Sequence, residues 1–147
     1  MALSIRDATR EDLERLEELE ALCFSVPWTR EMLESQLPDG QHVFLVAEED
    51  GKILGYVGMM FVLDEGSIAN VAVDPAARRR GIGRALIAEL IWRAQALALS
   101  FVTLEVREHN EPAIRLYAGF GFEPVGLRKQ YYDAPKENAL LMTRYLK

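Results

Sequence analysis

Residues 67–86 read SIANVAVDPAARRRGIGRAL, and this stretch decides the fold. Ser67–Val73 is an apolar run that predicts a strand, which Asp74-Pro75 ends. A long helix is predicted from Gly81 or Gly83 to Leu99, because apolar side chains recur there at helical spacing, at Ile82, Ala85, Leu86, Leu90, Ala94 and Leu97. A strand, a turn that contains glycine and an amphipathic helix in this order predict an α/β protein.

The turn between the strand and the helix has the composition of an anion site. Gly81 and Gly83 let the backbone turn so that successive N–H groups point the same way, toward phosphate oxygens. Four arginines within seven residues add charge to the site, namely Arg78, Arg79, Arg80 and Arg84.

Two common phosphate-binding motifs are excluded at this turn. A P-loop requires Gly-Lys-Ser/Thr at its end, whereas Gly81 is followed by Ile82, Gly83 and Arg84. A dinucleotide fingerprint fails because Leu86 occupies its third small position and seven residues separate the strand from Gly81. Two interpretations remain: recognition of the pyrophosphate of coenzyme A, or a solvated charge run before an amphipathic helix.

The segment before this stretch predicts a short strand followed by two helices. Leu3–Asp7 is the strand, and Thr9 with Asp12 forms a capping box at the start of the first helix. The apolar face of that helix consists of Leu13, Leu16, Leu19, Leu22 and Cys23. Pro27 interrupts the pattern, and Thr29 is expected to cap a second, short helix.

The remaining elements are strands and one more helix. Asp50-Gly51 is a dipeptide typical of hairpins, residues 64–66 are expected to turn, and Asn110 is expected to cap a helix that ends near Gly119 or Gly121. The predicted strands are Val43–Ala47, Ile53–Leu63, Phe101–Arg107, Glu123–Tyr132 and Ala139–Tyr145. Residues 1–147 are therefore interpreted as one domain with a mixed α/β sheet.

Composition limits the classes of function. Acidic residues outnumber basic ones by 23 to 17, which argues against a nucleic-acid or anionic-membrane binder. One cysteine and two histidines leave no disulfide framework and no histidine- or cysteine-rich metal site. No signal segment or membrane span is visible, so we expect a cytoplasmic protein that uses no metal.

Two motifs resemble those of the GNAT superfamily of N-acetyltransferases. Asn70–Pro75 followed by Arg78-x-x-Gly81-x-Gly83 is similar to the acetyl-CoA motif of that superfamily. The segment from Leu104 to Phe122 resembles the motif that follows it. The resemblance implies a V-splayed, mostly antiparallel sheet with acetyl-CoA between two strands that part. The cofactor residues it implies are Val71, Ala72, Val73, Arg78, Arg79, Arg80, Gly81, Ile82, Gly83, Arg84, Asn110 and Tyr117.

Further segments resemble the bacterial ribosomal-protein alanine N-acetyltransferases, the RimI-like enzymes. They are Phe24-Ser25-x-Pro27-Trp28, Arg128-x-x-Tyr131-Tyr132 and Glu137-x-Ala139-x-x-Met142. Asn138 departs from this pattern, because those enzymes commonly carry Asp there. The resemblance implies a groove for a peptide N-terminus, lined by Phe24, Pro27, Trp28, Tyr131 and Tyr132, although core packing also explains Phe24 and Trp28.

Transfer of acetyl to an amine requires a group that removes a proton. An α-amine has a pKa of about 8 and is largely protonated at neutral pH. Glu105 is the candidate base, on one strand face with Phe101, Thr103 and Arg107. The resemblance assigns the base to Glu105 and the general acid to Tyr117, with backbone N–H groups near Val71 and Val73 holding the thioester oxygen.

The other interpretations of these residues are structural. Glu105 could face solvent, Asn110 could serve only as an N-cap, and Tyr117 could be an aromatic residue at the core edge. Cys23 is a rival nucleophile for a covalent route, although its place on the apolar face favours a buried thiol.

The function implied by the resemblance is direct acetyl transfer in a ternary complex. The expected acceptor is the N-terminal alanine of small-subunit ribosomal protein eighteen. The alternatives are an acetyltransferase for other N-termini, for lysines or for a small amine, and, in another class, a non-catalytic acetyl-CoA-binding module.

Overall fold

A seven-stranded sheet lies at the centre of the computed structural model, which describes residues 2–133 and 135–147. The strand order is β1-β2-β3-β4-β5-β7-β6, and all neighbours are antiparallel except β4 and β5. The strands are β1 (Ser4–Asp7), β2 (His42–Glu49), β3 (Lys52–Val62), β4 (Glu65–Val73), β5 (Phe101–Arg107), β6 (Glu123–Asp133) and β7 (Lys136–Tyr145). The predicted mixed, mostly antiparallel sheet is therefore confirmed.

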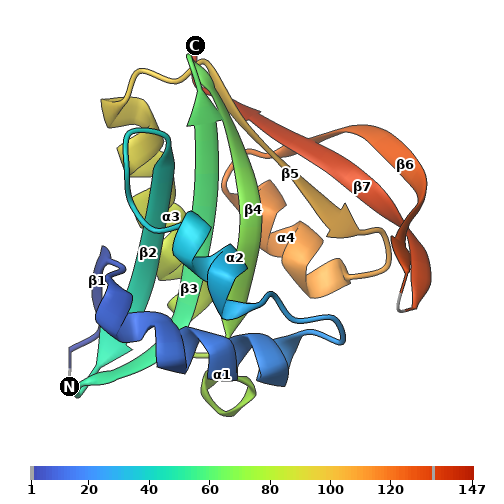
Figure 1. Ribbon diagram of the computed structural model, residues 1–147. Coiled ribbons are helices and arrows are strands. Elements are labelled where there is room, and N and C mark those ends of the chain that lie inside the picture. Colours follow the sequence, from blue (N-terminus) through green and yellow to red (C-terminus); the bar gives the residue numbers. More distant parts are fainter. Residues whose placement is uncertain (1, 134) are drawn as a thin grey trace.

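Helices cover both faces of the sheet (Figure 1). They are α1 (Leu13–Cys23), α2 (Arg30–Ser35), α3 (Ile82–Ala96) and α4 (Glu111–Gly119), with short 3₁₀ turns at Arg10–Asp12 and Pro75–Ala77. Leu16, Leu19 and Leu33 of α1 and α2 pack with Phe44 and Tyr56 on one face. The other face packs against α3 and α4, so two separate apolar cores hold the sheet.

Local signals in the sequence account for most element boundaries. Asp50 and Gly51 have φ of 53° and 79°, the two left-handed residues that a type I′ hairpin turn requires. Thr29 accepts a bond from the Met32 amide at 3.2 Å, and Thr9 with Asp12 forms the predicted capping box. These caps confirm where the first helices begin.

Three details of the prediction are wrong. Leu22 is 54% exposed because it lies beyond the buried stripe of α1. Leu97 is 44% exposed because α3 ends at Ala96 and the chain turns at Ala98, which places Leu99 in the core instead. Glu65 and Gly66 belong to β4, since they pair with Val62 and Phe61 across a turn at residues 63–64.

The described residues contain no helix with the length and apolarity of a membrane span.

Candidate active site

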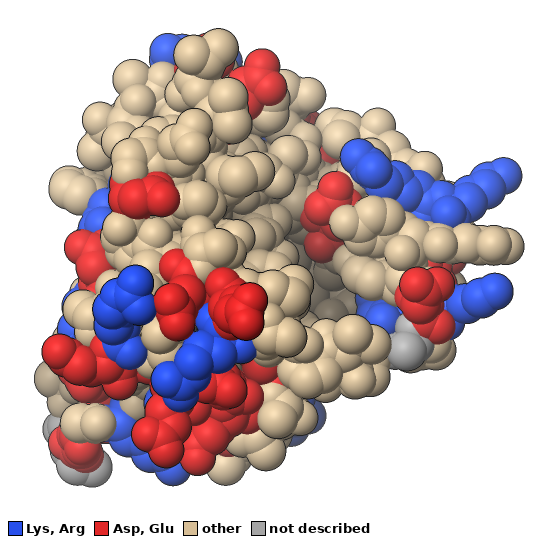
Figure 2. Space-filling view, in the orientation of Figure 1, with Lys and Arg blue, Asp and Glu red and all other residues tan. Residues whose placement is uncertain are grey.

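β4 and β5 are neighbours in the sheet but pair over only three residues each. Residues 65–67 of β4 lie opposite residues 101–103 of β5 in parallel register. Beyond these pairs β4 continues to Val73 and β5 to Arg107, and the ladder does not join these described residues. The two strands diverge in Figure 1, and Figure 2 shows the surface hollowed between β4 and the β6–β7 hairpin. We call this opening the splay; it confirms the expectation of two strands that part.

The β4 side of the splay presents backbone groups. The Asp74 amide donates to the Leu54 carbonyl of β3 at 2.8 Å. Because backbone groups alternate along a strand, Ala72 also faces β3, whereas Val71 and Val73 face the splay. The Val73 carbonyl accepts from Cys23 Sγ at 3.3 Å and from Arg78 Nε at 3.2 Å, which agrees with its position outside the ladder. Val71 and Val73 thus offer their amides to a ligand, and Ala72 does not.

The turn that begins α3 has the backbone geometry of an anion site. Gly81 is the N-cap residue at φ 78°, in the left-handed region, and no side chain caps it. The Ala85 amide makes the intrahelical bond to the Gly81 carbonyl at 3.0 Å. The amides of Ile82, Gly83 and Arg84 precede that bond and point out of the helix end. Gly83 lies within the helix, so only one of the two glycines makes the turn.

The four arginines of the turn do not converge on a single point. Arg78 bonds to the Val73 carbonyl, and its Nη2 lies 3.7 Å from Cys23 Sγ. Arg80 Nη2 donates to both carboxylate oxygens of Glu49, at 2.6 and 2.7 Å. The guanidinium of Arg84 lies over the Phe120 ring, 5.6 Å from its centroid. Glu49 therefore compensates the charge of Arg80 within the protein. A residue that binds phosphate is expected to keep its charge available for the ligand.

Glu105 lies on the β5 side of the splay. Burial alternates along β5, with Val102, Leu104 and Val106 buried and the residues between them half-buried, as the sequence predicts. The side chain of Glu105 is 26% exposed, so it is sheltered but reaches solvent. Arg128 Nε lies 3.9 Å from Glu105 Oε1 and is the charged group beside it.

Tyr117 approaches the same region from α4. Its side chain is buried and its ring centroid lies 5.9 Å from that of Phe122. Burial, with a smaller contribution from Tyr132, raises the pKa of Tyr117 to about 12. No hydrogen bond joins its hydroxyl to another of the described residues. Tyr117 therefore stays protonated at neutral pH.

Tyr131 and Tyr132 lie near the end of β6, on the hairpin whose Arg128 reaches Glu105. Their rings meet edge to face with centroids 5.0 Å apart. The Arg128 guanidinium lies 5.7 Å from the Tyr131 ring, and that of Arg107 lies 4.3 Å from the Tyr132 ring. Burial raises the pKa of Tyr132 to about 12, and the charges of Tyr131 and Glu105 add to the rise. Tyr132 thus interacts electrostatically with both Glu105 and Tyr117.

The aromatic loop between α1 and α2 lies on the β4 side of the splay. Phe24 and Trp28 are half-buried against the core beneath α1 and α2, whereas Pro27 is exposed. Core packing therefore accounts for part of both aromatic rings. No ring contact joins this loop to Tyr131 or Tyr132 among the described residues.

Glu20 is a residue of this region that the sequence prediction missed. Its side chain is fully buried, Oε1 accepts from the Trp28 amide at 2.7 Å, and Oε2 accepts from Asn70 Nδ2 at 2.8 Å. Burial raises the pKa of Glu20, and the Trp28 amide opposes that rise. The sequence did contain a signal for its burial. Position 20 is four residues after Leu16 and three before Cys23, so helical spacing places Glu20 on the same face as these two residues.

Two further residues have mainly structural contacts. Asn110 caps α4, with Oδ1 accepting from the Ala113 amide at 3.3 Å, and its side chain is exposed. Burial raises the pKa of the Cys23 thiol despite the nearby Arg78, which disfavours a thiolate nucleophile. Residues 2–133 and 135–147 contain no group of three or more His, Cys, Asp and Glu side chains arranged to hold a metal ion.

Comparison with curated proteins returns close relatives. The chain is 35% identical over 146 residues to the [ribosomal protein bS18]-alanine N-acetyltransferase of Haemophilus ducreyi, covering 97% of this chain and 99% of that protein. It is 32% identical over 133 residues to the Escherichia coli protein of the same name, covering 89% of each.

Solved structures share the fold. The crystal structure of the ribosomal-protein-S18-alanine N-acetyltransferase from Escherichia coli has a TM-score of 0.92 and 29% identity, over 99% of this chain and 95% of that chain. The structure of Arabidopsis thaliana NAA60 in complex with acetyl-CoA has a TM-score of 0.89 and 25% identity, over 99% of each.

The model of the acetyltransferase (GNAT) family matches residues 13–122, most of the chain. This span runs from the start of α1 to the end of the turn after α4, and so contains both sides of the splay. The chain belongs to the GNAT family of acetyltransferases.

Proposed function

We propose that this chain transfers the acetyl group of acetyl-CoA to the N-terminal amine of a protein, with the N-terminal alanine of ribosomal protein bS18 as the favoured acceptor. The observation that carries the proposal is the splay, which has backbone donors on one side and, on the other, a carboxylate with the buried Tyr117 and the half-buried Tyr132. The names of the relatives from Haemophilus ducreyi and Escherichia coli support this acceptor.

The features that fit acetyl-CoA lie on the β4 side. The free amides at the start of α3 suit the diphosphate, and Arg78, which bonds to the Val73 carbonyl, supplies a positive charge in the same turn. The pantetheine arm of coenzyme A is an extended chain with two amide groups, which suits the amides of Val71 and Val73 that face the splay. Bound acetyl-CoA would supply an activated acetyl thioester, and the amides of Val71 and Val73 would stabilise the charge that its oxygen gains.

Proton transfers belong to the β5 side. Glu105 removes the proton from the incoming amine, directly or through water, because it is the sheltered carboxylate at the opening. Tyr117 returns a proton to the departing thiolate, since a phenol with a pKa of about 12 stays protonated at neutral pH. With no thiolate nucleophile favoured at Cys23, these roles support direct transfer rather than an acetylated enzyme.

The acceptor is proposed to enter beside the tyrosines. Tyr131 is half-exposed, and both Tyr131 and Tyr132 offer ring faces and hydroxyls next to Glu105. The loop at residues 24–28 closes the opposite side, with Glu20 holding the Trp28 amide. An extended N-terminal peptide fits between two such walls better than a small amine, which would leave them uncovered.

Mass spectrometry of peptide products tests the proposal. A peptide that begins Ala-Arg-Tyr-Phe, incubated with the protein and acetyl-CoA, should gain one acetyl group on its N-terminal amine. A control peptide with a blocked N-terminus and an internal lysine should stay unmodified. Acetylation of the lysine instead, or binding of acetyl-CoA without transfer to either peptide, would contradict the proposal and favour a lysine acetyltransferase or a non-catalytic module.

A further inference from the structure

Strand β6 is irregular beside the tyrosines. Arg128 pairs with Ala139 of β7 and Tyr132 pairs with Glu137, so residues 129–131 all face the single residue Asn138. Two extra residues therefore form a wide bulge in β6. Gln130 lies in this bulge at φ 52°, a left-handed conformation that costs a non-glycine residue about 1 to 2 kcal/mol. The surrounding contacts must hold it there.

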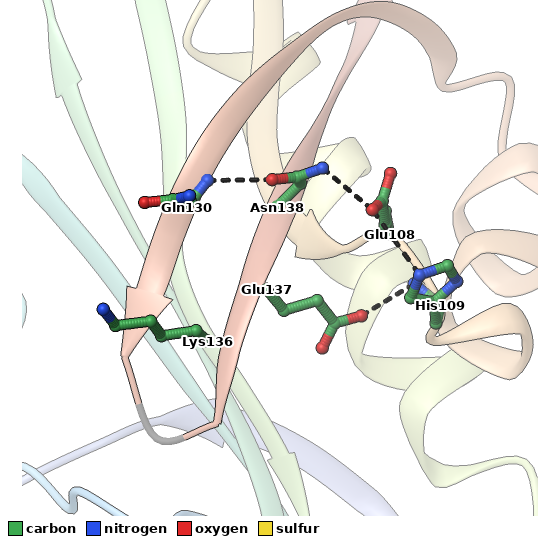
Figure 3. A pocket seen from close by; sticks show the side chains of 6 residues that line it. All are labelled: Glu108, His109, Gln130, Lys136, Glu137 and Asn138. Atoms are coloured by element: carbon green, nitrogen blue, oxygen red, sulfur yellow. Dashed lines mark hydrogen bonds and ion pairs between the residues drawn. The ribbon is translucent and has the colours of Figure 1, made fainter.

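The side chain of Asn138 pins the bulge (Figure 3). Its Oδ1 accepts from the Gln130 amide at 2.8 Å, and its Nδ2 donates to Glu108 Oε1 at 2.9 Å. Its backbone carbonyl also accepts from the Glu108 amide at 3.1 Å. An amide side chain is suited to this place because it accepts on one side and donates on the other.

Glu137 ties the same hairpin to the end of β5. Its Oε2 accepts from the His109 amide at 2.9 Å, and its Oε1 accepts from Arg107 Nη1 at 3.2 Å. The Arg107 guanidinium in turn lies over the Tyr132 ring. Glu137 thus fixes the β7 backbone next to Asn138. The side chain of Asn138 makes the contact to the bulge itself, at Gln130.

We propose that Asn138, with Glu108 as its acceptor, is a positioning residue for the acceptor amine. By holding Gln130 in its left-handed conformation, it sets the direction in which Tyr131 and Tyr132 leave the bulge toward Glu105. This inference rests on the proposed function, because it assigns the two tyrosines to acceptor binding. It does not involve the β4 side, where acetyl-CoA is proposed to bind.

We call the hydrogen bond from Asn138 to Glu108 the bridge, and its direction provides a test of the proposal. In Asn138→Asp, a carboxylate replaces the donor and faces the Glu108 carboxylate, so the two negative charges repel. In the double variant Asn138→Asp/Glu108→Gln, the new glutamine amide donates to the new aspartate. The bridge is then restored with its direction reversed, and the aspartate still accepts from the Gln130 amide.

Steady-state kinetics with the alanine peptide should separate these variants. Asn138→Ala and Asn138→Asp should raise KM for the peptide about tenfold, the factor that corresponds to about 1.4 kcal/mol. Turnover at saturation and KM for acetyl-CoA should stay within about twofold. The double variant should regain the KM of the unmodified protein, and Lys136→Ala, an exposed change on the same hairpin, should leave it unaltered.

The pH profile of Asn138→Asp gives a second readout. A proton bound by the two facing carboxylates, or by His109, whose Nε2 lies 3.5 Å from Glu108 Oε1, would relieve their repulsion, so the KM ratio of this variant to the unmodified protein should shrink as the pH falls from about 8 to about 6. A ratio that stays constant with pH, or a double variant that behaves like Asn138→Asp, would overturn the proposal.

Amide exchange measured by NMR keeps this test independent of the acceptor. The Gln130 amide should exchange slowly in the unmodified protein and in the double variant, and faster in Asn138→Ala. If no peptide is acetylated, the proposed function fails while this comparison still reports on the bridge. If the Gln130 amide is released and KM for the peptide does not change, the positioning role is wrong.

Discussion

The two sides of the splay differ in what they offer a ligand. The β4 side offers main-chain amides at Val71 and Val73, held in place by the ladder to β3. The β5 side offers side chains, chiefly Glu105 and Tyr117, carried by a strand and a helix. A point mutation removes a side chain but leaves a main-chain amide in place. Substitutions on the β5 side should therefore lower turnover strongly, whereas substitutions on the β4 side should change the affinity for acetyl-CoA far less.

Glu105→Gln should give the largest effect. Removing the base should lower turnover about 10³-fold, within the range for general base catalysis, and leave the affinity for acetyl-CoA unchanged. Rapid-mixing kinetics and calorimetry measure the two quantities. Glu123→Gln, an exposed change on β6, is the matched control. Turnover that stays the same for Glu105→Gln across the pH range removes Glu105 as the base.

Tyr117→Phe should follow, with a loss of about 10²-fold in turnover and the fold retained. Because the pKa of Tyr117 is raised to about 12, the acid is fully protonated below that value and is lost only as the pH approaches it. Loss of the Tyr117 proton should therefore cause no decline in the turnover of the unmodified protein between about pH 8 and about pH 10. The contrary result is a decline in this range that is absent in Tyr117→Phe. Such a decline would show a phenol that ionises early and would exclude Tyr117 as this acid.

The arginines of the turn should show a smaller, graded effect. Arg78→Ala should raise the Kd for acetyl-CoA about tenfold, because it removes a charge at the end of β4, where Arg78 bonds to the Val73 carbonyl. Arg80→Ala should change it less than about twofold, since Glu49 already compensates that charge. Calorimetric titration of both variants decides the point. Equal losses for the two would mean that net charge, rather than position, attracts the ligand.

Gly81→Ala should give a smaller loss of affinity than Arg78→Ala and tests the main-chain side directly. A side chain at φ 78° costs about 1 to 2 kcal/mol, which should appear as a lower free energy of unfolding and a Kd for acetyl-CoA raised about fivefold. Gly40→Ala is the control, because no atom lies within 4 Å of the added methyl group and the backbone there is not left-handed. Chemical denaturation that does not separate the two variants contradicts the prediction.

Local features of the fold were predictable and long-range ones were not. Caps such as Thr29 and turns such as Asp50-Gly51 depend on neighbours in the sequence, so residue type alone reveals them. The splay itself depends on the register between β4 and β5, separated by a helix, and only the family resemblance implied it. Local patterns do not encode such a register.

The same distinction applies to the candidate site. Alternation along β5 correctly put Glu105 opposite Val102, Leu104 and Val106. Glu20 escaped prediction because a carboxylate on a helix normally faces water, and its partners Trp28 and Asn70 come from elsewhere in the chain. The pairing of Arg80 with Glu49 was equally hidden, since a run of arginines does not reveal which of them is already compensated.

The three residue pairs that join β4 to β5 have a thermodynamic consequence. The sheet consists of two hydrogen-bonded units that are joined only by these three pairs. A ligand that contacts both units therefore adds a second connection between them. A ligand that binds the folded state alone adds RT ln(1 + [L]/Kd) to stability. Acetyl-CoA should therefore raise the melting temperature with increasing concentration, whereas the free diphosphate portion, which reaches one unit only and should bind with a higher Kd, should raise it less at equal concentration.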